Sequence, residues 1–156
     1  MDISSRLEFA APPTEVYAMM TDKAYLEEVC VASRSLGYEA SVDGNQTHTS
    51  RQLAAPESTA RFTGATLTVD DDTTWGAAQP DGSRTADVRL TVKGQPVTLK
   101  AVMRLTPGGR GSEITLSGEL KVAIPLLGKK IEQSAAPAVL AGFRTQQQVG
   151  DAWLAR

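Results

Sequence analysis

The feature that most constrains the fold is the contrast between the last third of the chain and everything before it. After the segment Ile124-Pro125-Leu126-Leu127-Gly128, the apolar spacing predicts one amphipathic helix of about thirty residues. The preceding region, from residue 36 to residue 124, alternates polar and apolar side chains as strands do. A helix of this kind must bury its apolar stripe, so it has to lie against the sheet. A curved sheet around one helix tends to enclose a cavity.

The strand-rich region predicts an antiparallel meander. Its strands are separated by short turn sequences, which are Asp43-Gly44-Asn45, Pro80-Asp81-Gly82, Lys93-Gly94-Gln95-Pro96 and Pro107-Gly108-Gly109. Short connections make consecutive strands antiparallel neighbours. An N-terminal strand and a weaker strand near residues 46–53 bring the expected number to about seven. Residues 54–66 follow no period, and we expect a loop or a short turn of helix there.

The N-terminal region predicts two short helices after the first strand. Pro12-Pro13 ends the strand, and Pro13 suits a first helical turn because the missing N–H has no partner there. Thr21-Asp22 offers a cap that splits the following apolar pattern into two helices. The expected fold is therefore α+β, with a curved antiparallel sheet wrapped around a long C-terminal helix. We expect residues 1–156 to form a single domain, and Pro137 to kink its last helix.

Composition limits the compartment and the redox chemistry. Cys30 is the only cysteine, so no intramolecular disulfide is possible, and its apolar context predicts an inert, buried thiol. No basic leader precedes the first strand, and no apolar run approaches the roughly 18 residues of a membrane span. We therefore expect a cytoplasmic protein without membrane insertion, either a monomer or a weak homodimer.

Charge is unevenly distributed along the chain. Residues 1–75 carry 12 acidic and 5 basic side chains, whereas residues 76–156 carry 6 acidic and 11 basic ones. Four of the basic side chains, Arg89, Lys100, Arg104 and Lys121, fall at outward positions of the expected strands, where solvated charges belong. Aromatic residues make up only 5% of the chain, which leaves few aromatic side chains on which nucleic-acid bases could stack. We expect no nucleic-acid partner.

The order of these elements resembles the helix-grip SRPBCC superfamily, which includes START-type lipid-transfer domains, birch-pollen-allergen-like proteins and polyketide cyclases. The opening Ala11-Pro12-Pro13-Thr14-Glu15-Val16-Tyr17, followed by Thr21-Asp22, is similar to a recurring start of that superfamily. Residues 118–132, with Thr74-Trp75-Gly76 upstream, look like an uncharacterised bacterial branch of it, a domain of unknown function. The resemblance implies a cavity between sheet and C-terminal helix for a lipid, a polyketide, a sterol or a similar apolar molecule.

Register decides which polar side chains face that cavity. A two-residue turn at Asp43-Gly44 or at Gly44-Asn45 would place Arg51 on the inner face and would point His48 outward, unless a bulge or an odd-length loop reverses them. His48 is the only histidine, which excludes a multi-histidine metal site. Residues 70–72 are three consecutive aspartates, and they alternate between the two faces of a strand, so they cannot converge on one cation. We expect no metal and no cofactor.

An inward Arg51 needs a partner, because an unpaired charge is costly to bury. Asp71 shares the inward parity of its strand, so the first hypothesis is an ion pair between the two residues. The second is that Arg51 anchors the carboxylate of a ligand. Both hold if a ligand completes the network.

Side chains near the middle of their elements and on the inner faces are predicted to line the cavity. They are Tyr38, Trp75, Met103, Leu116, Leu140 and Phe143, together with Arg51 and Asp71. Small residues at Gly118, Ala135, Ala138, Ala141 and Gly142 would leave either close packing or unfilled volume.

Three functions are compatible with this sequence. The first is non-catalytic binding or transport of a hydrophobic small molecule, with no catalytic residue. The second is a cyclase-, dehydratase- or isomerase-like enzyme, in which Tyr38, Arg51 and Asp71 would orient and protonate a carbonyl substrate. The third is a protein-interaction module.

Overall fold

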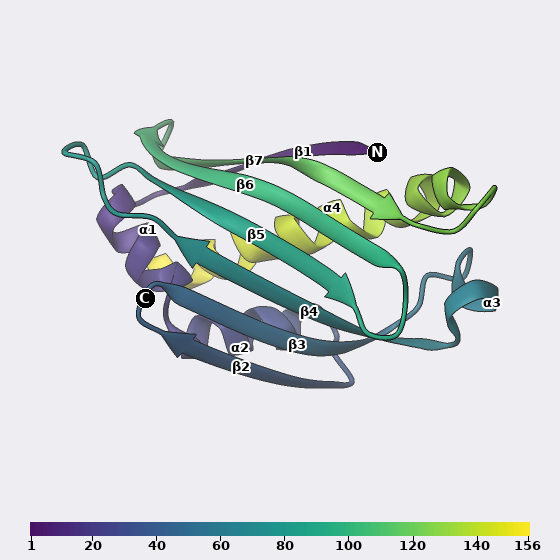
Figure 1. Ribbon diagram of the computed structural model, residues 1–156. Helices are drawn as coiled ribbons and strands as arrows, with labels where there is room; N and C mark the ends of the chain where they lie inside the picture. The colour runs from purple at the N-terminus through teal and green to yellow at the C-terminus, as the bar shows by residue number, and fades with distance from the viewer.

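The computed structural model describes all 156 residues and contains one sheet with helices packed against it (Figure 1). The strands are β1 (Asp2–Phe9), β2 (Gly37–Asp43), β3 (Gln46–Ala54), β4 (Thr66–Trp75), β5 (Arg84–Val92), β6 (Val97–Gly108) and β7 (Gly111–Val122). The helices are α1 (Pro13–Met20), α2 (Lys23–Ala32), α3 (Ala60–Thr63) and α4 (Gly128–Leu154). This arrangement confirms the expected α+β helix-grip fold, including its seven antiparallel strands and its long C-terminal helix.

The sheet is a meander whose far edge is closed by the N-terminal strand. Its strand order is β1-β7-β6-β5-β4-β3-β2, and every neighbouring pair is antiparallel. Figure 1 shows α4 crossing one face of the sheet, with α2 beside the β2–β3 end and α3 at the end where β4 begins. The α4 helix starts at that same end, after β7. Below we call it the α3 end.

Period-two burial builds the core. Along β6, the side chains of Leu99, Ala101, Met103 and Leu105 are buried while the residues between them are exposed. The largest core cluster contains 24 buried residues and joins the inner sheet face to α1, α2 and α4. Contact is close near the C-terminus of α4, where a Cβ added at Gly150 would lie 2.4 Å from a ring carbon of Phe9.

The β2–β3 hairpin has the two-residue turn that the sequence predicted. Asp43 pairs with Gln46, which leaves Gly44 and Asn45 as the loop. His48 consequently lies on the outer face, where its Nδ1 is 2.8 Å from Oδ1 of Asp72. The outward orientation of His48 is confirmed.

Local capping separates the first two helices as expected. The side chain of Asp22 accepts a hydrogen bond of 2.9 Å from the backbone N–H of Ala24, which caps the start of α2.

The unpatterned segment of residues 54–66 contains the four-residue helix α3. The α4 helix runs on both sides of Pro137 as one element. No helix combines the length and the apolar character that crossing a membrane requires.

A buried carboxylate fixes the start of α4 against β7. Oε2 of Glu132 accepts a hydrogen bond of 3.0 Å from the backbone N–H of Val122, and Oε1 accepts one of 3.1 Å from the N-terminal ammonium group. These bonds lower the pKa of Glu132, and the bond from Val122 makes the largest contribution. The contact holds three segments together at the α3 end of the sheet.

Candidate functional site

A cavity of about 550 Å³ lies between the inner face of the sheet and the helices α2 and α4. Of its 37 lining residues, 24 are hydrophobic. The lining residues come from β3 to β7, from all four helices, and from the segments that follow α2 and flank α3. Its volume lies within the range of about 300–1,000 Å³ that is typical of small-molecule sites. The cavity is therefore large enough for an organic ligand.

Small side chains on α4 leave this space open. Ala135, Ala138, Ala141 and Gly142 all line the cavity, and a Cβ built at Gly142 meets no atom within 4 Å. Here the small residues produce unfilled volume, one of the two predicted outcomes. Gly118 shows the other outcome, since its added Cβ would lie 2.3 Å from the carbonyl oxygen of Lys100.

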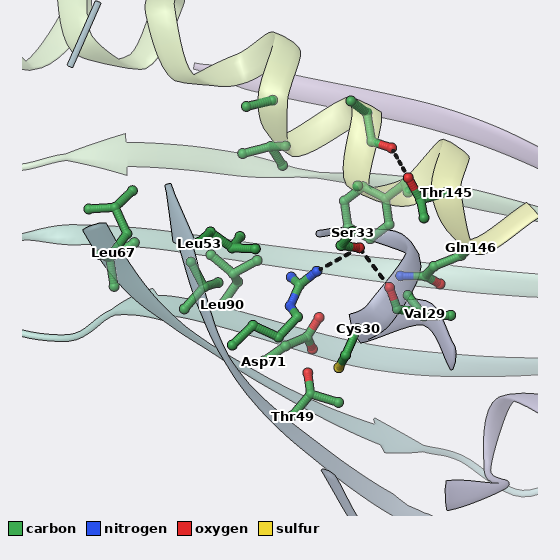
Figure 2. Close-up of a pocket in the computed structure, with 18 of the residues that line it drawn as sticks. Val29, Cys30, Ser33, Thr49, Leu53, Leu67, Asp71, Leu90, Thr145 and Gln146 are labelled. Atoms are coloured by element: carbon green, nitrogen blue, oxygen red, sulfur yellow. Dashed lines mark hydrogen bonds between the residues drawn. The ribbon is translucent and has the colours of Figure 1, made fainter. Parts of the chain in front are cut away.

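The wall formed by β3 and β4 changes from apolar to polar along its length. At the α3 end, Leu53 pairs with Leu67, and both line the cavity. Further along the inner face come Arg51 beside Val69, Thr49 beside Asp71, and Thr47 beside Thr73. Figure 2 shows this separation, with Leu53, Leu67 and Leu90 in one part of the cavity and Ser33, Cys30, Asp71 and Thr49 in the other. The cavity is thus amphipathic along the strands.

The guanidinium group of Arg51 has few protein partners. Its Nη1 donates only a long hydrogen bond, of 3.5 Å, to Oγ of Ser33, and its buried Nε has no hydrogen-bond partner. No nitrogen of Arg51 lies within 4.0 Å of a carboxylate oxygen of Asp71, so the ion pair predicted from the register does not form. Arg51 and Asp71 are diagonal neighbours on adjacent strands. The register places them on the same face, but the distance between their charged groups depends on the direction that each side chain takes.

Asp71 uses a different partner. Its Oδ1 accepts a hydrogen bond of 3.1 Å from Oγ1 of Thr73 on the same strand face. Burial raises the pKa of Asp71, and the positive charge of Arg51 opposes this effect in part. The residue is partly buried and lines the cavity.

Cys30 faces the same polar region from α2. The residue is 1% exposed and lines the cavity (Figure 2). Burial raises the pKa of its thiol, with a smaller opposing effect from Arg51. The thiol is therefore protonated at neutral pH, in agreement with the predicted inert, buried cysteine.

Five of the eight predicted site residues lie on the cavity wall: Arg51, Asp71, Trp75, Met103 and Phe143. That these residues contact a ligand stays a prediction. Three other predicted residues, Tyr38, Leu116 and Leu140, do not line the cavity.

The prediction that Tyr38 lines the cavity was wrong, because the edge strand that carries it extends beyond the helix covering the inner face of the sheet. It faces inward beside Arg51, but on edge strand β2, where it is 40% exposed and lies in a shallow groove with Val31 of α2. Leu116 is buried in the core, and Leu140 packs against that core as a partly buried residue. A position near the middle of a strand or helix can thus face either the packed core or the cavity, and the sequence did not distinguish the two.

Sequence reasoning missed the contribution of α2. Val29, Cys30 and Ser33 line the polar region, and α2 is held near α4 by the hydroxyl of Tyr25, which donates a hydrogen bond of 2.8 Å to the carbonyl oxygen of Gln146. The apolar stripe of α2 was visible in the sequence, but its packing partner was not. No group of three or more His, Cys, Asp or Glu side chains is positioned to hold a metal ion.

Comparison with known proteins gives one family match. The family model described as "Protein of unknown function (DUF2505)" matches residues 4–154. No curated protein matches the sequence.

Solved structures match the fold at low sequence identity. The protein TTHA0849 of Thermus thermophilus superimposes with a TM-score of 0.65 at 15% identity, covering 97% of this chain and 98% of that one. A STAR-related lipid transfer protein fragment from Xanthomonas axonopodis gives a TM-score of 0.65 at 14% identity, covering 99% and 86%. Protein Ms6760 of Mycobacterium smegmatis gives 0.62 at 16% identity, covering 99% and 90%. These likenesses establish a START-like fold.

Proposed function

This chain belongs to the DUF2505 family, and we propose that it binds a hydrophobic small molecule in the cavity between sheet and helices. The binding is non-catalytic, so the protein acts as a carrier or a sensor. The proposed compartment is the cytoplasm.

One observation carries the proposal, which is the cavity of about 550 Å³ with a predominantly hydrophobic wall. Protein interiors are normally packed without voids much larger than a water molecule. A void of this size exposes many apolar atoms with no packing partners, which destabilises the fold. Small residues on α4 keep this space open, whereas larger side chains at the same positions would fill it. A ligand that occupies the space supplies the missing contacts.

The structural likenesses support a ligand-binding role by analogy. The Xanthomonas axonopodis structure that shares the fold is described as a STAR-related lipid transfer protein. A lipid, a polyketide or a comparable apolar molecule is thus the proposed class of ligand.

The enzyme hypothesis loses one of its three residues. It required Tyr38, Arg51 and Asp71 to act on one carbonyl substrate, but Tyr38 lies in a separate shallow groove outside the cavity. Arg51 and Asp71 remain as polar groups that can orient a bound molecule.

Intrinsic fluorescence offers a direct test. The chain has two tryptophans, of which Trp75 is buried on the cavity wall and Trp153 does not line the cavity. In a Trp153→Phe variant, titration with lauric acid or with an environment-sensitive apolar dye should change the emission of Trp75 saturably. Native mass spectrometry of the purified protein should show bound apolar molecules. Absence of both signals would contradict the proposal.

A further inference from the structure

We propose that the ligand is an amphiphile with a carboxylic acid head group, which Arg51 binds, and an apolar tail that extends toward the α3 end of the cavity. This inference rests on the proposed function and adds the chemical class and the orientation of the ligand.

The first argument is the partner deficit of Arg51. A guanidinium group carries five N–H donors in a planar fork that matches a carboxylate. In this structure its side chain makes one hydrogen bond to the protein, the 3.5 Å bond to Ser33, and Nε is buried without a hydrogen-bond partner. Ser33 is itself engaged, because its hydroxyl donates a hydrogen bond of 2.8 Å to the carbonyl oxygen of Val29. Arg51 is partly buried, and its buried Nε–H calls for an acceptor that the protein does not provide.

The second argument is charge. The charged side chains that line the cavity are Arg34, Arg51 and Asp71, so positive charge is in excess there. Asp71 is the only acidic one, and it lies beyond ion-pair distance of Arg51 and bonds instead to Thr73. Burial raises the pKa of Asp71, and the positive charge of Arg51 opposes this effect in part. A monoanionic head group restores neutrality at Arg51.

The third argument is the direction of the polarity change. From Arg51 toward the α3 end, the strands contribute only apolar side chains to the wall, which are Leu53, Ala54, Leu67, Val92, Val97 and Val122. Thr59 and Thr63 also line this end, and their hydroxyls donate hydrogen bonds to the carbonyl oxygens of Pro56 and Thr59. Ile131 of α4 closes the same region from the helix side. In the other direction the β3–β4 wall presents Thr47, Thr49 and Thr73. An acid head at Arg51 therefore directs an alkyl tail toward the α3 end.

The test compares lauric acid with methyl laurate, which have the same tail and differ in charge. We expect the wild-type protein to bind the acid at least about tenfold more tightly at neutral pH, because hydrogen bonds to a charged group are the stronger ones. Arg51→Met should abolish this preference while methyl laurate still binds. Arg144→Met makes the same chemical change on the exposed side of α4, outside the cavity wall, and should leave the preference unchanged.

The outcomes separate this inference from the proposed function. Equal affinity of the wild type for acid and ester, or a preference that survives Arg51→Met, would overturn the head-group assignment and leave hydrophobic binding intact. Binding of neither compound would contradict both. The wild-type comparison needs no variant, so the inference stays testable even if Arg51→Met does not fold. Thermal unfolding of each variant identifies such a failure.

Discussion

At the scale of single residues, the site is defined by two charges that are close without forming a pair. The hairpin register places Arg51 and Asp71 on the same sheet face, as a diagonal pair on β3 and β4. Each then takes a different neighbour, namely Ser33 for Arg51 and Thr73 for Asp71. The space between the charges belongs to the cavity rather than to the packed core. Both groups are therefore available to a bound molecule.

The pH dependence of stability should report on Asp71. Its pKa is raised above the ordinary value of 3.8, chiefly by burial. Between the unfolded and folded pKa values the folded state holds more protons, so the free energy of unfolding falls as pH rises through that window. Asp71→Asn removes the titrating group, and denaturant titrations from pH 3 to pH 7 should show a smaller fall than in the wild type. An unchanged pH profile would mean that Asp71 is solvated.

The absence of a direct ion pair also sets an expectation for Arg51→Met. Breaking a well-formed buried ion pair typically costs about 3–5 kcal/mol. Since no such pair exists here, we expect the free energy of unfolding to change by no more than about 1.5 kcal/mol, because a poorly satisfied charge is replaced by an apolar chain. Chemical denaturation measures this. A loss within the larger range, recovered by adding Asp71→Asn, would show that the two residues pair in solution.

At the scale of elements, α4 combines two kinds of packing along one helix. Near its C-terminus Gly150 permits close contact with Phe9, and near its middle Gly142 faces open space. The same residue type thus serves opposite purposes at two positions. The difference depends on what lies opposite: β1 and α1 in the first case, and the cavity in the second.

Substitutions at these two glycines should separate cavity from core. Gly142→Leu should fold, since nothing lies within 4 Å of an added Cβ, but should weaken lauric acid binding by occupying the cavity. Gly142→Ala is the control for helix propensity and should stabilise the fold by up to about 1 kcal/mol with little effect on binding. Gly150→Ala should destabilise, because its Cβ would overlap the Phe9 ring. Calorimetric titration and thermal melts measure these effects, and full binding by Gly142→Leu would contradict the assigned cavity.

At the scale of the whole molecule, one side of the sheet packs less tightly against the helices than the other, and this leaves the cavity. The β1, β6 and β7 side of the sheet packs tightly against α4 and α1, whereas the β3–β5 side stands away from α4 and is covered in part by α2. The cavity lies within this less packed region. A ligand there contacts the sheet and two helices at once, and it therefore links elements that otherwise share few contacts.

Ligand binding should consequently stabilise the entire fold. At a free ligand concentration of about 100 times Kd, mass action adds about 2.7 kcal/mol to the free energy of unfolding. For a chain of 156 residues this corresponds to a rise in Tm of about 5–10 °C. Scanning calorimetry with lauric acid checks the value. Gly142→Leu should show a smaller rise, and an equal rise in both proteins would locate the binding elsewhere.

The sequence by itself determined the periodic elements and the register of the hairpin. Alternation predicted the strands, proline and Thr21-Asp22 predicted the helix boundaries, and the two-residue turn at Gly44-Asn45 placed Arg51 inward and His48 outward. These features are local, because side-chain period and turn length depend only on neighbouring residues.

The tertiary structure decided which inward positions meet the cavity. Tyr38 and Arg51 share a face and pair directly, yet only Arg51 lines the cavity, whereas Tyr38 on the edge strand lies in a separate groove beside α2 and α4. Likewise Gly118 on β7 is closely packed, whereas Gly142 on the cavity wall has open space beside it. The distance between a helix and a sheet depends on contacts between residues far apart in the chain, and no local pattern encodes it.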